Sequence, residues 1–272
     1  MDNDNFISFR MPVPTCYQDV LSHFYYAENN SVDIVKKTFL PSFKAVLIFN
    51  FGAKSILYFN QDKEIHIDKY LVLGPIKQVF DYSLPPSSQI LVANFKDDAL
   101  YRFFGSTSVA QHSPIHPDDL LVQSCLIGLW TELDRMNDIA QRVNYILEFG
   151  KHYLGDRNVI AEKLANFNHQ NLNPIKYLAS QLNQTERNIQ LHQKKYLGIT
   201  YKEISRYQRF SKTIELIQNI ATSGTKIDWF EIVNKGGYFD QSQLIRDFKH
   251  YIGISPTKYL KFQEGFCIAK AK

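Results

Sequence analysis

Short runs of β-branched and aromatic residues follow one another along the first 95 positions of the chain. Gly, Pro, Asn, Asp and Ser separate these runs at intervals of about 8–12 residues, which is the spacing of strands in all-β domains. The pattern therefore predicts a sandwich or a small barrel in this part of the chain. The predicted strands lie within residues 33–40, 43–52, 54–60, 64–74 and 88–95.

The periodicity changes from Asp97 onward, where apolar residues recur at the spacing of amphipathic helices. Helices are predicted within 97–105, 118–136 and 139–154, and after the polar break 155–158 nearly every segment is helical. We therefore predict an α+β chain, in which a β-rich barrel with trailing helices precedes an all-α part. The predicted helices of that second part lie within residues 158–168, 173–182, 185–197, 201–221, 228–235 and 241–252.

The charge of the chain changes at the same break. Residues 1–155 hold 13 Lys and Arg against 17 Asp and Glu, whereas residues 156–272 hold 18 against 10. A solvated surface alone would not place the whole positive excess in one half, and such segregation is typical of a basic module that faces an anionic partner. We therefore predict two domains, 1–155 and 156–272, packed closely because no Pro- or Gly-rich linker joins them.

The basic half contains an internal repeat. The segment IQLHQKKYLGIT (189–200) aligns with LIRDFKHYIGIS (244–255), so that Lys, Tyr and Gly recur at equivalent places. Each copy follows another predicted helix and a short turn. Helix, tight turn and second helix form a helix-turn-helix unit, and two such units are predicted at about 173–197 and 228–252.

Helix-end signals support the second unit. Asp228 and Glu231 have the spacing of a capping box, and Gly237 can adopt the positive φ that a tight turn requires. Gly253 is placed to end the last helix of the unit, and Ser255 before Pro256 predicts the start of another helix.

A helical wheel of residues 241–252 separates an apolar face from a polar one. Leu244, Phe248 and Ile252 share a narrow arc with Tyr251 beside it, so this face is predicted to be buried. The opposite face could be an ordinary solvated surface, but the duplication and the local charge favour contact with DNA. Arg and amide side chains can bond base edges, and Lys and His suit phosphate. The candidate DNA-binding residues of this helix are Gln241, Ser242, Gln243, Arg246, Lys249 and His250.

The stretch GYFDQSQLIRDFKHYIGISPTKYL resembles the C-terminal signature of AraC/XylS-type transcriptional regulators. The resemblance covers about residues 158–262 and is most specific in this second unit. It implies two homeodomain-like helix-turn-helix units, bridged here by helix 201–221, whose recognition helices enter successive major grooves on one face of DNA.

The first unit departs from the family pattern at two positions. Leu191 stands where the family usually has Arg, and Gln193 stands where it usually has an aromatic residue. Leu191 can touch a thymine methyl group but cannot bond guanine, and Gln193 falls on the apolar arc and needs a polar partner there. The candidate DNA-binding residues of the first recognition helix are Arg187, Gln190 and Lys194.

The N-terminal half resembles the cupin-like sensor modules that precede such DNA-binding domains, which implies ligand sensing, dimerisation or both. Its aromatic residues are predicted to be core rather than ligand contacts. His66 and Asp68 on one strand lack the further ligands of a cupin metal site, and Pro114 prevents helical pairing of His112 with His116, so no metal or other cofactor is predicted. The aromatic residues concerned are Phe49, Phe51, Tyr58, Phe59 and Tyr70.

Enzyme motifs are not found in the sequence. It contains no P-loop, HExxH, GxSxG or dinucleotide fingerprint, and Cys16, Cys125 and Cys267 lack the surroundings that activate a thiol. The odd, scattered cysteines, the acidic and polar N-terminus and the lack of a long apolar run predict a cytoplasmic protein without a signal peptide.

These observations predict a transcriptional regulator that binds double-stranded DNA and is not an enzyme. RNA polymerase, an unidentified small-molecule effector and a second copy of the chain are further candidate partners, and no membrane partner is expected. Two alternatives stay open: an interaction scaffold with degenerate DNA binding, and a DNA-repair methyl acceptor fused to an AraC-like module.

Overall fold

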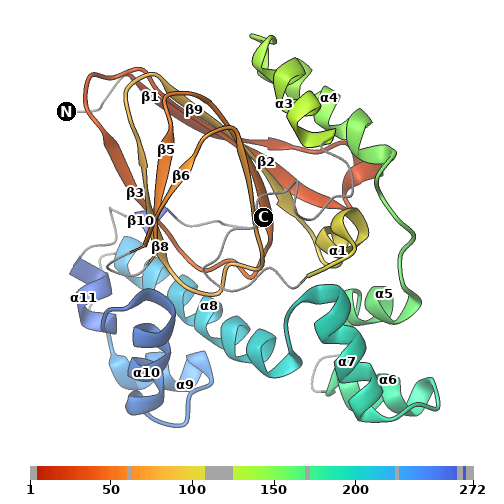
Figure 1. Ribbon diagram of the computed structural model, residues 1–272. Coiled ribbons are helices and arrows are strands. Elements are labelled where there is room, and N and C mark those ends of the chain that lie inside the picture. Colours follow the sequence, from red (N-terminus) through yellow and green to blue (C-terminus); the bar gives the residue numbers. More distant parts are fainter. Residues whose placement is uncertain are drawn as a thin grey trace.

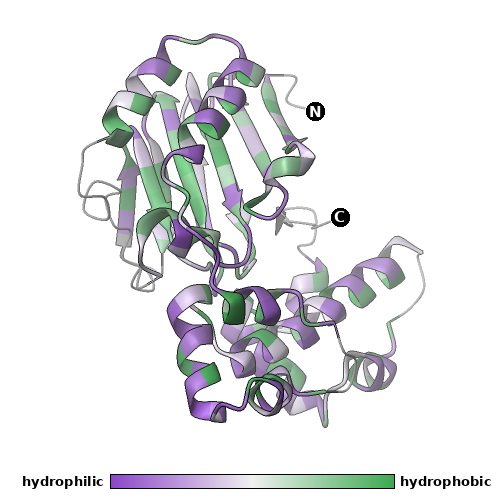
Figure 2. Cartoon of the chain, turned by 90° about the vertical axis from the view of Figure 1, so that its right-hand side faces the viewer, coloured by the Kyte–Doolittle hydropathy of each residue, from purple (hydrophilic) through white to green (hydrophobic). Residues whose placement is uncertain are grey.

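The computed structural model describes residues 5–59, 63–107, 125–168, 172–223, 227–261 and 266–267. The chain forms two masses, one built on β-sheets and one built of helices (Figures 1 and 2). Within the described part of the chain, no helix is both long and apolar enough to cross a bilayer.

Two five-stranded sheets face one another in the N-terminal part. The first, sheet A, has the strand order β1-β2-β9-β4-β7, and the second, sheet B, has the order β10-β3-β8-β5-β6. All pairings are antiparallel except that of β10 with β3. The strands are β1 (Phe6–Pro12), β2 (Leu21–Asn29), β3 (Val35–Phe39), β4 (Val46–Gly52), β5 (Ser55–Phe59), β6 (Lys63–Ile67), β7 (Tyr70–Leu73), β8 (Phe80–Leu84), β9 (Ser88–Phe95) and β10 (Phe266–Cys267); a 3-10 turn, η1 (Thr15–Tyr17), precedes β2.

The inner strands of sheet A are buried on both faces, whereas its edge strand β1 is mostly exposed. Along β9, Ile90 and Val92 belong to the core between the sheets, and Leu91 and Ala93 belong to a second core on the opposite face. Because successive side chains of a strand point to opposite faces, a strand covered on both sides is a nearly continuous apolar run. This explains why "SQILVANF" contains so little polar alternation.

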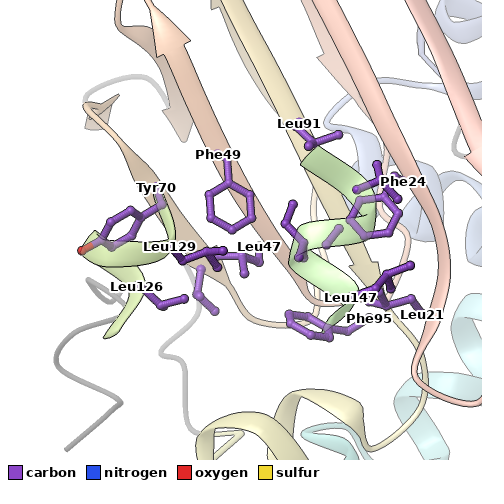
Figure 3. Packing of buried hydrophobic residues seen from close by; sticks show 14 of the residues in the cluster. Leu21, Phe24, Leu47, Phe49, Tyr70, Leu91, Phe95, Leu126, Leu129 and Leu147 are labelled. Carbon is purple, nitrogen blue, oxygen red and sulfur yellow. The ribbon is translucent and has the colours of Figure 1, made fainter. Parts of the chain in front are cut away.

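Helices cover the outer face of sheet A. They are α1 (Ala99–Phe104), α3 (Cys125–Asp134) and α4 (Ile139–Lys151). Figure 3 shows Leu129 of α3 beside Leu47 of β4, and Leu147 of α4 beside Leu21 and Phe95 of the sheet.

The C-terminal part is helical. The long helix α8 (Tyr201–Thr222) runs beneath the sheets and joins two groups of short helices (Figure 1). A capping box of Thr200 and Glu203 starts α8, where each residue's side chain bonds the other's backbone N–H. The short helices are α5 (Val159–Ala165), α6 (Pro174–Gln181) and α7 (Glu186–Leu197) before α8, and α9 (Trp229–Gly236), α10 (Gln241–Ile252) and α11 (Pro256–Lys261) after it.

The predicted fold class is confirmed, and the predicted strands need correction. Residues 64–74 do not form one strand, because the chain bends at Asp68–Lys69 and passes from β6 in sheet B to β7 in sheet A. Strands β1, β2, β8 and β10 were not predicted. Cys267, expected in a frayed end, pairs with Phe39 in β10.

Several contacts join the two parts of the chain. The Lys77 ammonium lies 2.7 Å from the Glu203 carboxylate, and the Tyr207 hydroxyl donates to the Pro41 carbonyl at 2.7 Å. The Phe43 ring stacks on the Tyr207 ring, with 4.3 Å between centroids. The β-rich part thus rests directly on α8, while the division at residues 155–156 stays a prediction.

The segment between α4 and α5 is held against the β-rich part. The Arg157 guanidinium lies 3.1 Å from Asp98 and 3.4 Å from Asp97, and the Gly155 N–H donates to the Arg102 carbonyl at 3.0 Å. Burial raises the pKa of Asp98, and the charge of Arg157 opposes that effect.

Candidate nucleic-acid interface

The start of α10 is fixed by a reciprocal pair of hydrogen bonds. The Asp240 carboxylate accepts from the Gln243 N–H at 2.6 Å, and the Gln243 side-chain oxygen accepts from the Phe239 N–H at 3.0 Å. Gly237 ends α9 with φ +76°, a left-handed conformation that glycine adopts without a Cβ penalty. Residues 237–240 therefore form a defined tight turn between the two helices.

The inner face of α10 is buried as the wheel predicted. Leu244, Phe248, Tyr251 and Ile252 pack against residues of α8 and α9, and the Phe210 ring of α8 lies 5.2 Å from the Phe248 ring. Burying each large apolar side chain contributes about 1.5–3 kcal/mol, so this face anchors the helix in one orientation.

A buried ion cluster also fastens α10 to α8. Asp247 is 2% exposed, and its two carboxylate oxygens lie 2.7 Å from Arg206 Nε and 3.1 Å from Arg209 Nη2. The Arg209 guanidinium also lies over the Tyr238 ring, at 4.7 Å. This carboxylate therefore links the buried face of α10 to α8.

The outer face of α10 is open to solvent. Its predicted DNA-binding residues are exposed, except that Gln243 is half-buried and has its oxygen engaged in the helix cap. The Arg246 Nε donates to the Ser242 carbonyl at 3.3 Å, which holds the guanidinium along the helix. The exposed residues are Gln241, Ser242, Arg246, Lys249 and His250.

His250, which was predicted to suit phosphate, is mainly uncharged at neutral pH. Burial, and then the positive charge of Arg206, lower its pKa below the usual value, and Asp247 opposes this in part. The imidazole is therefore mainly neutral at pH 7, so it offers a hydrogen bond rather than a positive charge. Lys249 one position earlier keeps the cationic role on this end of the helix.

Helix α7 repeats the plan of α10. The Thr185 side chain caps its first turn, and Ile189 and Leu197 are buried at the places that Leu244 and Ile252 occupy in α10. Both helices end in a left-handed glycine, with φ +70° at Gly198 and φ +72° at Gly253. The predicted tandem helix-turn-helix arrangement is present, with α6 and α7 as the first unit and α9 and α10 as the second.

The outer face of α7 is exposed as well. Arg187, Gln190 and Lys194 lie on the surface, and Leu191 is 58% exposed beside them. Their roles in DNA contact stay predictions, as do those of the α10 residues.

Gln193 is buried, as its place on the apolar arc required. It is 3% exposed and borders a cavity of about 990 Å³ between the β-rich and helical parts. Phe43, Lys44 and Lys96 line the same cavity from the other side. The amide thus lies at the boundary between the two parts of the chain, beside that cavity.

One exposed residue was missed by the sequence reasoning. Phe239 is 93% exposed and lies directly before the cap of α10, whereas the preceding Tyr238 is 5% exposed. Such an exposed aromatic side chain at the tip of a recognition helix is a candidate for apolar contact with a base. The signal was the pair of adjacent aromatic residues in a turn, of which only one can face the core.

The structure shows where most of the residues considered as metal ligands or ligand contacts in the N-terminal part lie. Asp68 is not on the strand of His66 but in the bend after it, where Lys54 holds it at 2.9 Å. Among the described residues, no three His, Cys, Asp or Glu side chains gather as a metal site would need. His112 and His116 lie outside the described residues.

The aromatic residues of the N-terminal part are mainly core residues. The core beneath the helices contains Phe49, Phe51 and Tyr70, and the core between the sheets contains Phe59. The Tyr58 hydroxyl lies 3.2 Å from the Ser83 hydroxyl.

Comparison with known proteins gives structural similarity only. No protein-family model and no curated protein matches the chain. A 1.65 Å structure of ToxT from Vibrio cholerae covers 95% of this chain and 98% of its own, with 13% identity and a TM-score of 0.39. ToxT bound to (E)-4-(8-methylnaphthalen-1-yl)but-3-enoic acid covers 95% of this chain and 99% of its own, with 14% identity and a TM-score of 0.40.

A third structure covers a smaller share of the chain. A cupin protein from Desulfovibrio desulfuricans covers 35% of this chain and 85% of its own, with 13% identity and a TM-score of 0.26. ToxT is a regulator of the AraC family, the family that residues 237–260 resemble.

Proposed function

We propose that this protein is a sequence-specific, DNA-binding transcriptional regulator. The observation that supports the proposal most directly is the shared construction of α7 and α10. Each is the second helix of a helix-turn-helix unit, buries equivalent apolar positions and exposes a polar face with at least one Lys and one Arg.

The exposed faces of α7 and α10 would make different contacts with DNA. Arg246 can bond the O6 and N7 atoms of guanine in the major groove, and Lys249 and Lys194 can approach phosphates. Arg187 and Gln190 would contact DNA from the first unit. Leu191 would supply only apolar contact, so α10 would contribute more of the sequence preference than α7.

The β-rich domain would act by the way it holds the two units. It touches the end of α7, where the Thr107 hydroxyl donates to the Lys194 and Lys195 carbonyls at 3.2 and 2.8 Å. It also touches the end of α10, where the Val79 N–H donates to the Tyr251 carbonyl at 2.9 Å. A shift in this domain would therefore change how both recognition helices are presented.

Selection of bound sequences from a random DNA library, followed by mobility-shift titration, tests the proposal. We expect one enriched motif with two half-sites about one helical turn apart. Affinity should fall with salt at a log–log slope of about −0.9 for each phosphate contact. Absence of any shift at low salt would favour the scaffold alternative, and methyl transfer from alkylated DNA to a cysteine would favour the methyl acceptor.

A further inference from the structure

An apolar cavity of about 310 Å³ lies on the outer face of sheet A, under α1 and α4. It lies on the opposite face of sheet A from the space between the sheets, and it shares Leu21 and Phe95 with the cavity between the domains. Leu47, Ala93 and Phe95 line it from the sheet, Phe104 lines it from α1, and Ile146 and Leu147 line it from α4. Leu47, Phe95 and Leu147 are visible around this region in Figure 3.

The volume of the cavity indicates the size of molecule that fits. An apolar protein cavity of roughly 150 Å³ stays dry and binds benzene. This cavity is about twice as large, and its wall is aliphatic and aromatic, so a fused bicyclic hydrocarbon or a branched apolar molecule matches it. A ligand that fills it would gain contacts that the cavity wall otherwise lacks.

The charged residues of the wall already have partners. Of the described residues that line the cavity, Lys151 and Asp19 are charged. The Lys151 ammonium lies 2.6 Å from Glu148, and Asp19 lies 3.2 Å from Arg102. A charged ligand would therefore find no unpaired countercharge there, whereas the cavity between the domains is lined by Lys44 and Lys96. The chemistry of the cavity under α1 and α4 favours an uncharged ligand.

The wall of the cavity continues into the first DNA-binding unit. Phe103 and Phe104 line the cavity, and Tyr101 of the same short helix meets Tyr196 of α7 edge-on at 4.6 Å. The Lys195 ammonium lies 5.6 Å from the centre of the Tyr101 ring. Because α1 has only six residues, displacement of its Phe103 and Phe104 side would move Tyr101 as well.

We propose that this cavity binds an uncharged apolar molecule of bicyclic size, and that α1 transmits its occupancy to α7. The transmission to α7 rests on the proposed DNA-binding function, and the binding of the apolar molecule does not. The cavity would thus be an effector site on the helix-covered side of the sensor domain.

Binding is tested on the full chain with 2-naphthol, which is uncharged at pH 7, by calorimetry. Ala93→Leu places extra carbons in the cavity, and we expect it to weaken binding by about tenfold or more. The matched control is Val92→Leu, because Val92 of the same strand lines the small space between the sheets. Its binding should equal that of the unaltered chain. Binding that survives Ala93→Leu, or that only Val92→Leu removes, overturns the assignment.

The charge preference and the place of binding have separate tests. 2-Naphthoate is the carboxylate of the same ring system. We expect that it does not bind in this cavity, so that any binding of 2-naphthoate is the same in the unaltered chain and in Ala93→Leu. Crystals of the unaltered chain with 6-bromo-2-naphthol should show the bromine anomalous signal beside Ala93 and Leu147. A bromine between the sheets or between the domains overturns the proposal even if Ala93→Leu fails to fold.

The link to α7 is measured by mobility shift with and without 2-naphthol. We expect DNA affinity to change by about fivefold or more in the unaltered chain and not in Ala93→Leu. Unchanged affinity in the presence of bound naphthol overturns the transmission through α1. A chain that binds naphthol but no DNA would instead contradict the proposed function and leave the binding site in place.

Discussion

Arg246 and Lys249 lie about one turn apart on the exposed side of α10 and offer different chemistry to a duplex. Arg246→Ala should cost about 1–3 kcal/mol at the cognate site and relax the preference at one base pair, since a guanidinium can bond guanine in two places. Lys249→Ala should weaken binding to all sequences alike, since an ammonium bonds phosphate. Mobility-shift titration against the cognate site and single-base variants measures both effects.

Loss of charge alone needs a control in this comparison. Lys54→Ala removes an exposed cation from the turn between β4 and β5, far along the chain from the helices, and should leave DNA affinity nearly unchanged. If Arg246→Ala has no effect at the cognate site, Arg246 is not a base-reading residue.

His23 on β2 gives the stability of the fold a dependence on pH. Burial first, then the charges of Arg10 and Lys44, lower its pKa from 6.5 to about 4. The unfolded chain binds a proton at His23 below pH 6.5 and the folded chain does not, so stability falls as pH drops from about 6.5 toward 4. The part-exposed ring reduces the effect to about 1 kcal/mol at pH 5.

Urea unfolding at pH 7.5 and pH 5 tests this sign. The unaltered chain should lose more stability between the two values than His23→Gln does. An equal loss in both chains would mean that other groups account for the acid sensitivity.

At the scale of elements, the attachment of α10 to α8 depends on one buried carboxylate. Asp247→Asn keeps the shape of the side chain but leaves Arg206 and Arg209 without their shared anion. Breaking a buried ion pair in this way costs about 3–5 kcal/mol, less where the arginines reach solvent, as they do in part here. Chemical unfolding should show this loss, whereas Glu231→Gln on the exposed pair with Lys235 should change stability by less than about 1 kcal/mol. Equal effects of the two substitutions would contradict a structural role for Asp247.

The helical elements could be read from the sequence because their signals are local. The predicted 241–252 is α10 to the residue, and the predicted 201–221 is α8 less its last residue. Asp228, Gly237 and Gly253 mark helix ends by their own side chains or backbone freedom. Apolar residues three and four apart meet on one helix face whatever the rest of the chain does.

The strands that were missed have weak local signals or depend on partners far along the chain. β1 is mostly exposed and, within the described residues, pairs only with the neighbouring β2, so it has no clear alternation of apolar and polar residues. β2 is interrupted by an irregular register near Leu21 and is buried on both faces in part. The bend at Asp68 looks like continuous strand sequence, because the change of sheet is decided by pairing and not by composition.

At the scale of the whole molecule, the sequence pattern could not show how the domains meet. Leu40 is a residue of the β-rich half, yet it belongs to the core that α8, α9 and α10 build. Gln193 was predicted on the apolar arc, where its amide would need a polar partner, and the structure places it beside a cavity between the two parts of the chain. Of the candidate site, the exposed residues of α7 and α10 followed from periodicity, whereas Phe239 and the ion cluster of Asp247 required tertiary contacts.

The β-rich domain touches the two helix-turn-helix units through different residues, so we expect that each contact can be removed without the other. Tyr101 meets Tyr196 of α7, while Phe43 stacks on Tyr207 and lies 6.1 Å from the Tyr251 ring of α10. Tyr101→Ala should speed amide hydrogen exchange in the last turn of α7 and leave exchange in α10 unchanged. Phe43→Ala should speed exchange in the last turn of α10 and leave exchange in α7 unchanged. Exchange followed by mass spectrometry measures both variants in the full chain. If either substitution loosens both helices equally, the interface opens as one unit, and the domain would hold α7 and α10 together instead of adjusting them one at a time.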